Sequence, residues 1–357
     1  MDEIDLLHGQ SSRTYPLKQA RNVMSERFKN GMRNLLGACA LMAAGVAVAA
    51  QPSAGMKAEP GMFKIGVEPW LGYGQLHVAA AHDLYRKQGL ETVSIVNFSE
   101  DKDINAALAS GQIDAATIAT HTAMGMVAAG LPVKIVLMLD QSMTADAIIA
   151  APEIKSLKEL KGKQVAFEEG TTSDILLHSA LASAGMLWSD IQPVPMPAST
   201  AGAALIAGKV PVAVTYEPYL SAAKQQNAKV NMLYSGKDDP GIISDVLVVR
   251  DSVLEERPGQ VLAMIKAWDA ALSHYQNNTQ ADRAVIAKAV GSTAADMASA
   301  FDGVHFYSLA DNQAQLSHGF SHETFAHILK SATAAGLIQQ SVDATKTIDA
   351  RFVEALK

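Results

Sequence analysis

The chain has 357 residues, of which 49% are hydrophobic and 18% are charged, and its formal net charge is −7. The length allows two domains, and the composition is ordinary for a globular protein. No basic stripe runs along the chain, which argues against nucleic acid as a partner.

The N-terminal residues have the pattern of a secretory signal. Basic residues at 27–33 precede the apolar run 35–50, which ends in small residues. The pattern predicts a leader and signal peptide over residues 1–50, with cleavage near Ala49 or Ala50. It therefore predicts a periplasmic protein.

This leader leaves some alternatives open. The true start is Met1 or Met24, and retention as a membrane anchor and lipidation of Cys39 are both less favoured than cleavage. Cys39 is the only cysteine, so cleavage would remove every possible disulfide and thiolate metal ligand from the mature chain. Residues 51–61 contain Pro and Gly and are predicted to be a linker.

Strands and helices alternate from residue 62 onward, which predicts a mostly parallel sheet covered by helices. The polar stretch 152–163 is interpreted as the first crossing to a second lobe. In the first half, strands are expected at 64–67, 92–98, 113–120, 133–139 and 147–151. Helices are expected at 75–87, at 103–111, and after residues 121–122 as far as 130.

The second lobe repeats this alternation before the chain returns. Its strands are expected at 164–167, 191–196 and 210–217, and its helices from 173, at 201–207 and at 219–226. An apolar strand at 245–250 returns the chain, and the Ala-rich remainder is predicted to be helical. We expect lobe 1 at 62–148 plus 248–357, lobe 2 at 149–247, and a cleft between them that closes by hinge motion.

One strand-turn-helix unit has the design of a binding loop. After the strand 164–167, Gly170 closes a turn and a cluster of hydroxyl residues begins a helix. Unpaired backbone N–H groups and the helix dipole at such a start can bind an anionic or polar ligand group. Residues 64–89 have the same design, which suggests two lobes facing one ligand.

Several short motifs follow one another in a characteristic order over residues 63–290. They are PWLGYG at 69–74, NAALASGQID at 105–114, LKELKGK at 157–163, AALIAGK at 203–209, VTYEPY at 214–219 and SDVLV at 244–248. Their order resembles that in the periplasmic solute-binding proteins of ABC importers, in the nitrate/sulfonate/taurine group that includes thiamine-pyrimidine binding proteins. The resemblance implies a two-lobe α/β fold of type II, a small-molecule solute, and an ABC permease and ATPase as partners.

Candidate ligand contacts lie in loops at strand ends, where open α/β sheets bind their ligands. Three have a structural alternative: Trp70 packing beneath its loop, His121 capping a helix, and Asp140 forming a turn. The candidates are Glu68, Trp70, Tyr73, Thr120, His121, Asp140, Glu169, Gly170, Thr171, Thr172, Ser173, Tyr216, Glu217, Tyr219 and Asp245.

These loops contain several acidic residues and no Lys or Arg. Repulsion at close range disfavours a purely anionic solute such as nitrate. We therefore expect an amine-bearing, zwitterionic or nitrogen-heterocyclic solute, either taurine-like or pyrimidine-like.

The sequence predicts neither a metal nor a cofactor. His318, His322 and His327 are interpreted as a solvated helix face, and His82, like the other helical histidines, has no partner at metal-binding spacing. No nucleophile elbow or phosphate loop occurs at a fitting position, so we expect a binding protein rather than an enzyme. We also expect the protein to be a monomer.

Two other functions stay open at this point. The first is a ligand-sensing subunit of a signalling system. The second, an enzyme of thiamine-pyrimidine synthesis, is less favoured because the resembling synthases carry a cysteine-rich motif that this chain lacks.

Overall fold

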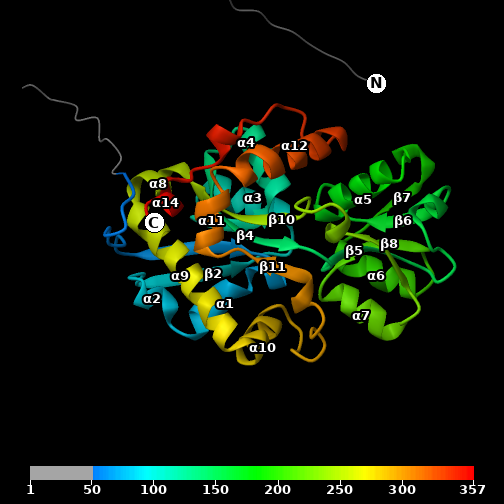
Figure 1. Ribbon diagram of the computed structural model, residues 1–357, viewed down its shortest axis with the longest axis horizontal. Helices are drawn as coiled ribbons and strands as arrows, with labels where there is room; N and C mark the ends of the chain where they lie inside the picture. The colour runs from blue at the N-terminus through cyan, green and yellow to red at the C-terminus, as the bar shows by residue number, and fades with distance from the viewer. Residues whose placement is uncertain (1–50) are drawn as a thin grey trace, which may run out of the picture. The chain divides into compact units, whose positions relative to one another are not determined.

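The computed structural model describes residues 51–357 (Figure 1). The predicted leader, its cleavage site at Ala49 or Ala50, and Cys39 lie outside the described residues. Within residues 51–357, no helix combines the length and the apolarity that a membrane crossing requires.

Six strands form the sheet of the first lobe. They are β1 Met62–Val67, β2 Thr92–Asn97, β3 Ala115–Ala119, β4 Val133–Ser142, β10 Ser244–Arg250 and β11 Val304–Phe306. Their order in the sheet is β11-β4-β10-β3-β1-β2. The central strands β3 and β10 are almost wholly buried, as expected for a sheet that helices cover on both faces.

A second sheet of five strands forms the other lobe. They are β5 Asp146–Ala150, β6 Gln164–Phe167, β7 Gln192–Pro195, β8 Val212–Tyr216 and β9 Asn231–Ser235. Their order is β7-β6-β8-β5-β9.

The chain crosses between the two sheets at 143–145 and again at 236–243. The predicted first crossing at 152–163 is wrong, because β5 already pairs with β8 and β9 of the second sheet. The lobe limits at 148/149 and 247/248 stay a prediction. Strand pairing places both crossings a few residues earlier in the chain.

Most strands of each sheet run in one direction, as the strand-helix alternation predicts, but each sheet contains an antiparallel strand in its interior. β5 runs antiparallel to β8 and β9, and β10 runs antiparallel to β3 and β4. Each of these strands is the first after a crossing, so it enters its sheet from the side that faces the other lobe. As a result Asp146, at the start of β5, pairs with Tyr216, and Asp245, near the start of β10, pairs with Ala119.

Helices cover both sheets, and the C-terminal remainder is helical as predicted apart from β11 (Figure 1). The long helix α9 buries Trp268, whose Nε1 donates to the carbonyl of Tyr307 at 2.9 Å. The helices are α1 Gly74–Ala81, α2 Leu84–Lys87, α3 Asp101–Ser110, α4 Thr120–Ala128, α5 Thr172–Ser183, α6 Ala198–Ile206, α7 Tyr219–Gln226, α8 Asp251–Glu256, α9 Pro258–Asn277, α10 Thr279–Ala289, α11 Leu309–Gln315, α12 Phe325–Ala334, α13 Ala344–Thr347 and α14 Arg351–Glu354.

The predicted helix 75–87 is broken into α1 and α2. His82 follows the last residue of α1, and Asp83 adopts the left-handed conformation with φ of 59°. A left-handed residue interrupts the helical ladder, and Asp tolerates this conformation better than most residues do. The break leaves His82 at the end of a helix rather than in the middle of one.

The strand-turn-helix unit around Gly170 forms as predicted. β6 ends at Phe167, Gly170 has φ of 81°, and the Thr171 side chain caps α5 by accepting from the Ser173 backbone N–H. Glycine suits this turn because it adopts positive φ without a steric penalty.

Candidate functional site

A cavity of about 450 Å³ is lined by residues from both sheets and their connecting loops. This volume is typical of a site for a small organic molecule. The predicted candidates that line it are Glu68, Trp70, Tyr73, Glu169, Thr171, Thr172, Tyr216 and Asp245.

Other predicted residues lie beside the cavity rather than on its wall, and each has a structural partner. The hydroxyl of Thr120 donates to the carbonyl of Ser244 at 2.8 Å. The carboxylate of Glu217 accepts from the backbone N–H and the hydroxyl of Ser221 at 3.0 and 2.9 Å. The Ser173 hydroxyl accepts from the Glu168 backbone N–H at 3.1 Å. These contacts fix the loops that carry the lining residues.

His121 and Gly170 line a second cavity, of about 640 Å³, next to the first. Burial lowers the pKa of His121 to about 4, against an opposing hydrogen bond with the Gly170 backbone. The imidazole is therefore neutral at pH 7. This pair joins α4 of one lobe to the turn before α5 of the other.

Several residues that line the cavity were not predicted from the sequence. Ser99 and Glu100 come directly after β2, and Pro197 and Ser199 follow β7, so the strand-end rule could have identified them. Asp146 also lines the cavity, but it stands at the amino end of β5, where that rule does not look. The remaining lining residues that were not predicted as contacts are Ala119, Glu168, Met196 and Ile243.

Aromatic side chains from both lobes meet at this cavity. The rings of Trp70 and Tyr216 lie edge to face, with centroids 6.1 Å apart at 72°. Tyr219, which does not line the cavity itself, packs edge-on against Tyr216 at 5.3 Å. Such pairs stabilise the arrangement by about 0.5–1.5 kcal/mol beyond the area they bury. Together they form an aromatic wall that spans the two lobes.

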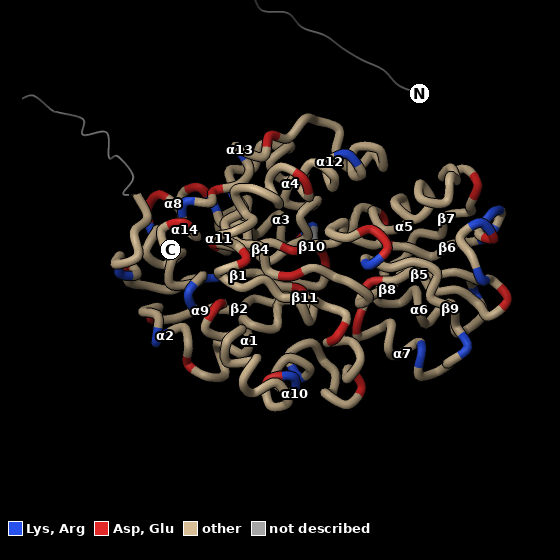
Figure 2. The backbone as a smooth tube through the Cα atoms, viewed as in Figure 1, with Lys and Arg blue, Asp and Glu red and all other residues tan. Residues whose placement is uncertain are grey.

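The cavity is acidic. Asp and Glu positions gather where the ends of β10 and β11 approach β5 and β8 (Figure 2). No Lys or Arg occurs among the described residues that line the cavity. Its carboxylates belong to Glu68, Glu100, Asp146, Glu168, Glu169 and Asp245.

Buried carboxyls extend this acidic region below the cavity wall. Asp140 is fully buried, accepts from Trp70 Nε1 at 3.2 Å, and lies opposite Asp245 in the pairing of β4 with β10. Burial raises the pKa of Asp140, and it also raises the pKa of Asp146 to about 7, with a further contribution from the charge of Glu217. Because burial disfavours the charged form of a carboxyl, this region holds protons near neutral pH.

Gly72 leaves room for the contact between Trp70 and Asp140. A Cβ at this position would lie 2.2 Å from Trp70 Nε1 and 2.4 Å from Asp140 Cγ. We expect Gly72→Ala to displace this pair and to lower the free energy of unfolding by about 1–3 kcal/mol, measured by urea denaturation.

Gly125→Ala is the matched control, because a Cβ on this helical residue of α4 meets nothing within 4 Å. Alanine at Gly125 should be neutral or stabilise the helix by up to about 1 kcal/mol. Equal stabilities of the two variants would contradict the steric argument at Gly72.

The three histidines interpreted as a solvated face, His318, His322 and His327, are exposed in the structure. His327 bonds through Nε2 to Asp239 Oδ1 at 2.7 Å. Among residues 51–357, the one group whose spacing suits a metal ion lies elsewhere in the first lobe and consists of His82, His274 and Asp282.

Comparison with known proteins gives a family and a fold. The model of the family described as NMT1/THI5 like matches residues 72–304. Among curated relatives, a protein of Escherichia coli K12, provisionally assigned as an aliphatic sulfonates-binding protein, is 28% identical over 274 residues, which cover 76% of this chain and 84% of that protein. The riboflavin-binding protein RibY of Chloroflexus aurantiacus is 29% identical over 207 residues, covering 56% of this chain and 57% of RibY.

Solved structures share the architecture at low sequence identity. The aliphatic sulphonate binding protein SsuA from Escherichia coli has 24% identity and a TM-score of 0.67, with 82% of this chain and 92% of that chain covered. The nitrate-binding protein NrtA from Synechocystis PCC 6803 has 17% identity and a TM-score of 0.67, with 84% and 89% covered. Both are periplasmic binding proteins, and the likeness confirms the expected two-lobe fold.

Proposed function

We propose, since the chain belongs to the NMT1/THI5-like family, that it binds a small amine-bearing or nitrogen-heterocyclic solute between its two lobes. In this proposal the protein acts in the periplasm as a monomer, catalyses no reaction, and delivers the solute to the permease and ATPase of an ABC importer. The names of its relatives, which include sulfonate-, nitrate- and riboflavin-binding proteins, support a role in solute capture.

The observation that carries the solute class is the acidic, aromatic lining of the cavity. A cationic group placed there meets carboxylates from both lobes, and the Trp70 and Tyr216 rings offer faces to a cation or a planar heterocycle. Contacts to both lobes exist together only when the lobes are close, so the solute would favour the closed state.

An anionic solute finds few donors in the same cavity. The start of α5, which is predicted from the sequence to bind an anionic or polar ligand group, is already capped. The Gly170 N–H donates to Asp174 Oδ2 at 2.8 Å, and the Ser173 N–H donates to Thr171 Oγ1 at 3.3 Å. With these donors occupied and carboxylates nearby, sulfonate or nitrate alone is disfavoured.

Matched small molecules test this proposal. Ethylamine carries the ammonium group, ethanesulfonate carries the sulfonate group, and taurine carries both on one carbon frame. We expect ethylamine, taurine and the heterocycle 4-aminopyrimidine to raise the melting temperature of the protein, because ligands that bind only the folded state stabilise it. Ethanesulfonate should leave it unchanged. A larger shift with ethanesulfonate than with any amine would contradict the solute class.

A further inference from the structure

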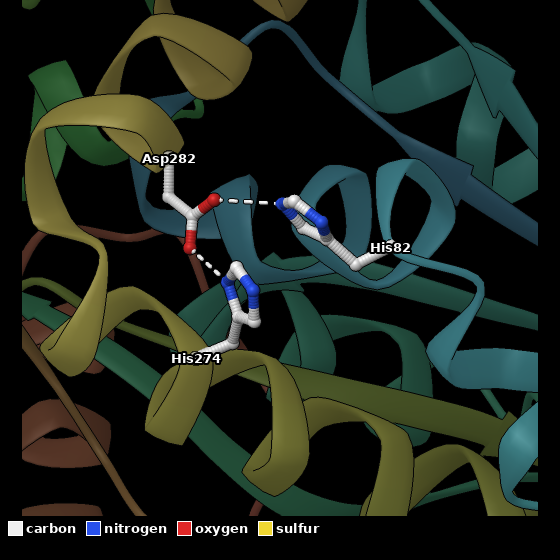
Figure 3. A group of neighbouring side chains, drawn as sticks. All are labelled: His82, His274 and Asp282. Carbon is white, nitrogen blue, oxygen red and sulfur yellow. Dashed lines mark hydrogen bonds and ion pairs between the residues drawn. The ribbon is translucent and has the colours of Figure 1, made fainter.

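Three side chains from three helices meet at the far end of α1 (Figure 3). His82 follows the last residue of α1, His274 lies in the last turn of α9, and Asp282 lies in the first turn of α10. Asp282 is fully buried, while the side chains of His82 and His274 keep 33% and 29% of their surface exposed. The cluster is therefore anchored inside and open to solvent on one side.

The ligating atoms of the three side chains point toward one another. His82 Nε2 lies 2.9 Å from Asp282 Oδ1, and His274 Nδ1 lies 2.6 Å from Asp282 Oδ2. One nitrogen or oxygen from each residue can be chosen so that all lie within 4.8 Å of one another. We propose that His82, His274 and Asp282 form a binding site for a transition metal ion, with Zn²⁺ as the best fit.

The donor set and its spacing favour zinc over other common ions. Two imidazoles and one carboxylate suit Zn²⁺ and its neighbours in the first transition series, whereas Mg²⁺ and Ca²⁺ prefer oxygen ligands. Tetrahedral zinc with bonds of about 2.0–2.1 Å holds its ligand atoms about 3.3 Å apart. His82 Nε2 and His274 Nδ1 each lie nearest a different oxygen of Asp282, at 2.9 and 2.6 Å, so a single ion between them requires side-chain rotations that open these separations toward this value. The exposed side leaves a fourth position for water.

A metal-free ion-pair cluster is the competing explanation. In that case each histidine donates one N–H to Asp282, and the two imidazole rings lie with centroids 3.9 Å apart and planes tilted by 31°. With a divalent ion bound, the same ring nitrogens contribute lone pairs to the metal, and each ring carries its proton on its other nitrogen.

The site is separate from the solute cavity. α1 begins directly after Tyr73, which lines that cavity, and His82 stands at its other end, about 12 Å further along at 1.5 Å per residue. A bound ion would join α1, α9 and α10 within the first lobe. It would therefore stabilise the fold rather than contact the solute.

Zinc titration of the untagged, EDTA-stripped protein tests the site. By isothermal titration calorimetry we expect wild type to bind one Zn²⁺ per chain, and Mg²⁺ at the same concentration to give no heat. His82→Gln and His274→Gln should each weaken Zn²⁺ binding at least about tenfold, since even the loss of a supporting residue around a metal costs that much. His322→Gln, at an exposed histidine outside the cluster, is the matched control and should bind like wild type.

Co²⁺ supplies a second measurement that needs no variant, in case the loss of a histidine around buried Asp282 impairs folding. Four-coordinate Co²⁺ gives intense visible absorption bands and six-coordinate surface-bound Co²⁺ gives weak ones, so intense bands that Zn²⁺ abolishes are expected for wild type. Equal Zn²⁺ affinities for all folded variants, no saturable Zn²⁺ binding, or weak Co²⁺ bands would each overturn the proposal in favour of a metal-free ion-pair cluster.

Discussion

Replacing Asp146 with asparagine is expected to weaken the binding of an amine solute about 10- to 100-fold at pH 8, because a charge-assisted hydrogen bond contributes about 1.5–3 kcal/mol. Asp146 lines the cavity at the start of β5 and is 6% exposed. Asparagine keeps the size of the side chain and removes only its charge. The loss of affinity therefore measures the contribution of that charge.

The same substitution should change how affinity and stability depend on pH. Burial, and then the charge of Glu217, raise the pKa of Asp146 to about 7, so wild type carries this charge at pH 8 and loses most of it at pH 5.5. Wild-type affinity for the amine should fall as pH drops through about 7, while that of Asp146→Asn should stay flat.

A raised carboxyl pKa contributes stability that is fully present below the unfolded value near 4 and is lost as pH rises through about 7. The variant should therefore be more stable than wild type at pH 8 by up to a few kcal/mol, and not at pH 4.

Calorimetric titration with ethylamine at pH 5.5 and pH 8 measures the effect on affinity. Urea denaturation at pH 4, pH 5.5 and pH 8 measures the effect on stability. Glu217→Gln is the matched control, because Glu217 is buried and acidic but bonds to Ser221 beside the cavity. The Glu217→Gln variant should bind ethylamine as tightly as wild type does at pH 8. The pH at which half of this affinity is lost should be lower than in wild type, because the charge of Glu217 no longer raises the pKa of Asp146. Equal losses of affinity in both variants at pH 8 would contradict the assignment of the contact to Asp146.

The parts of the site that could be predicted from sequence are those that depend on local signals. The turn at Gly170 and the capped helix after it follow from short-range rules, and the structure has both. Glu68, Trp70 and Tyr73 were expected because they follow β1, and they line the cavity. Strand ends are recognisable in sequence because apolar runs stop there.

The parts that could not be predicted depend on pairing between distant strands and helices. The sequence does not show that β5 and β10 run against their neighbours, and this reversal brings Asp146 to the cavity. The cluster of His82, His274 and Asp282 joins residues up to 200 positions apart, so no spacing within one helix indicates it. Conversely, Glu217 follows β8 and so meets the strand-end rule for a ligand contact. Its carboxylate nevertheless bonds to Ser221, and the residue does not line the cavity.

Trp70 connects the aromatic wall to the buried carboxyls, so its removal should have a large effect on stability. The side chain is 6% exposed, packs edge-on against Tyr216, and donates to Asp140. We expect Trp70→Ala to lower the free energy of unfolding by about 3–5 kcal/mol, as is usual when a buried aromatic ring is truncated. Trp70→Phe keeps a ring and loses only the donor, so a loss of about 1–3 kcal/mol is expected.

Comparing these two variants separates packing from ligand contact. A cation over an aromatic ring gains about 0.5–2 kcal/mol. Trp70→Phe keeps a ring and should therefore retain most of the affinity for ethylamine. Folded Trp70→Ala has no ring at this position, so its affinity for ethylamine should fall several-fold or more. Trp188→Phe is the control, since Trp188 stacks on His178 within the second lobe and does not line the cavity. Calorimetric titration at a temperature where all three variants are folded measures these affinities. Wild-type affinity in Trp70→Ala would show that the indole packs beneath its loop without touching the solute, which is the structural alternative for this residue.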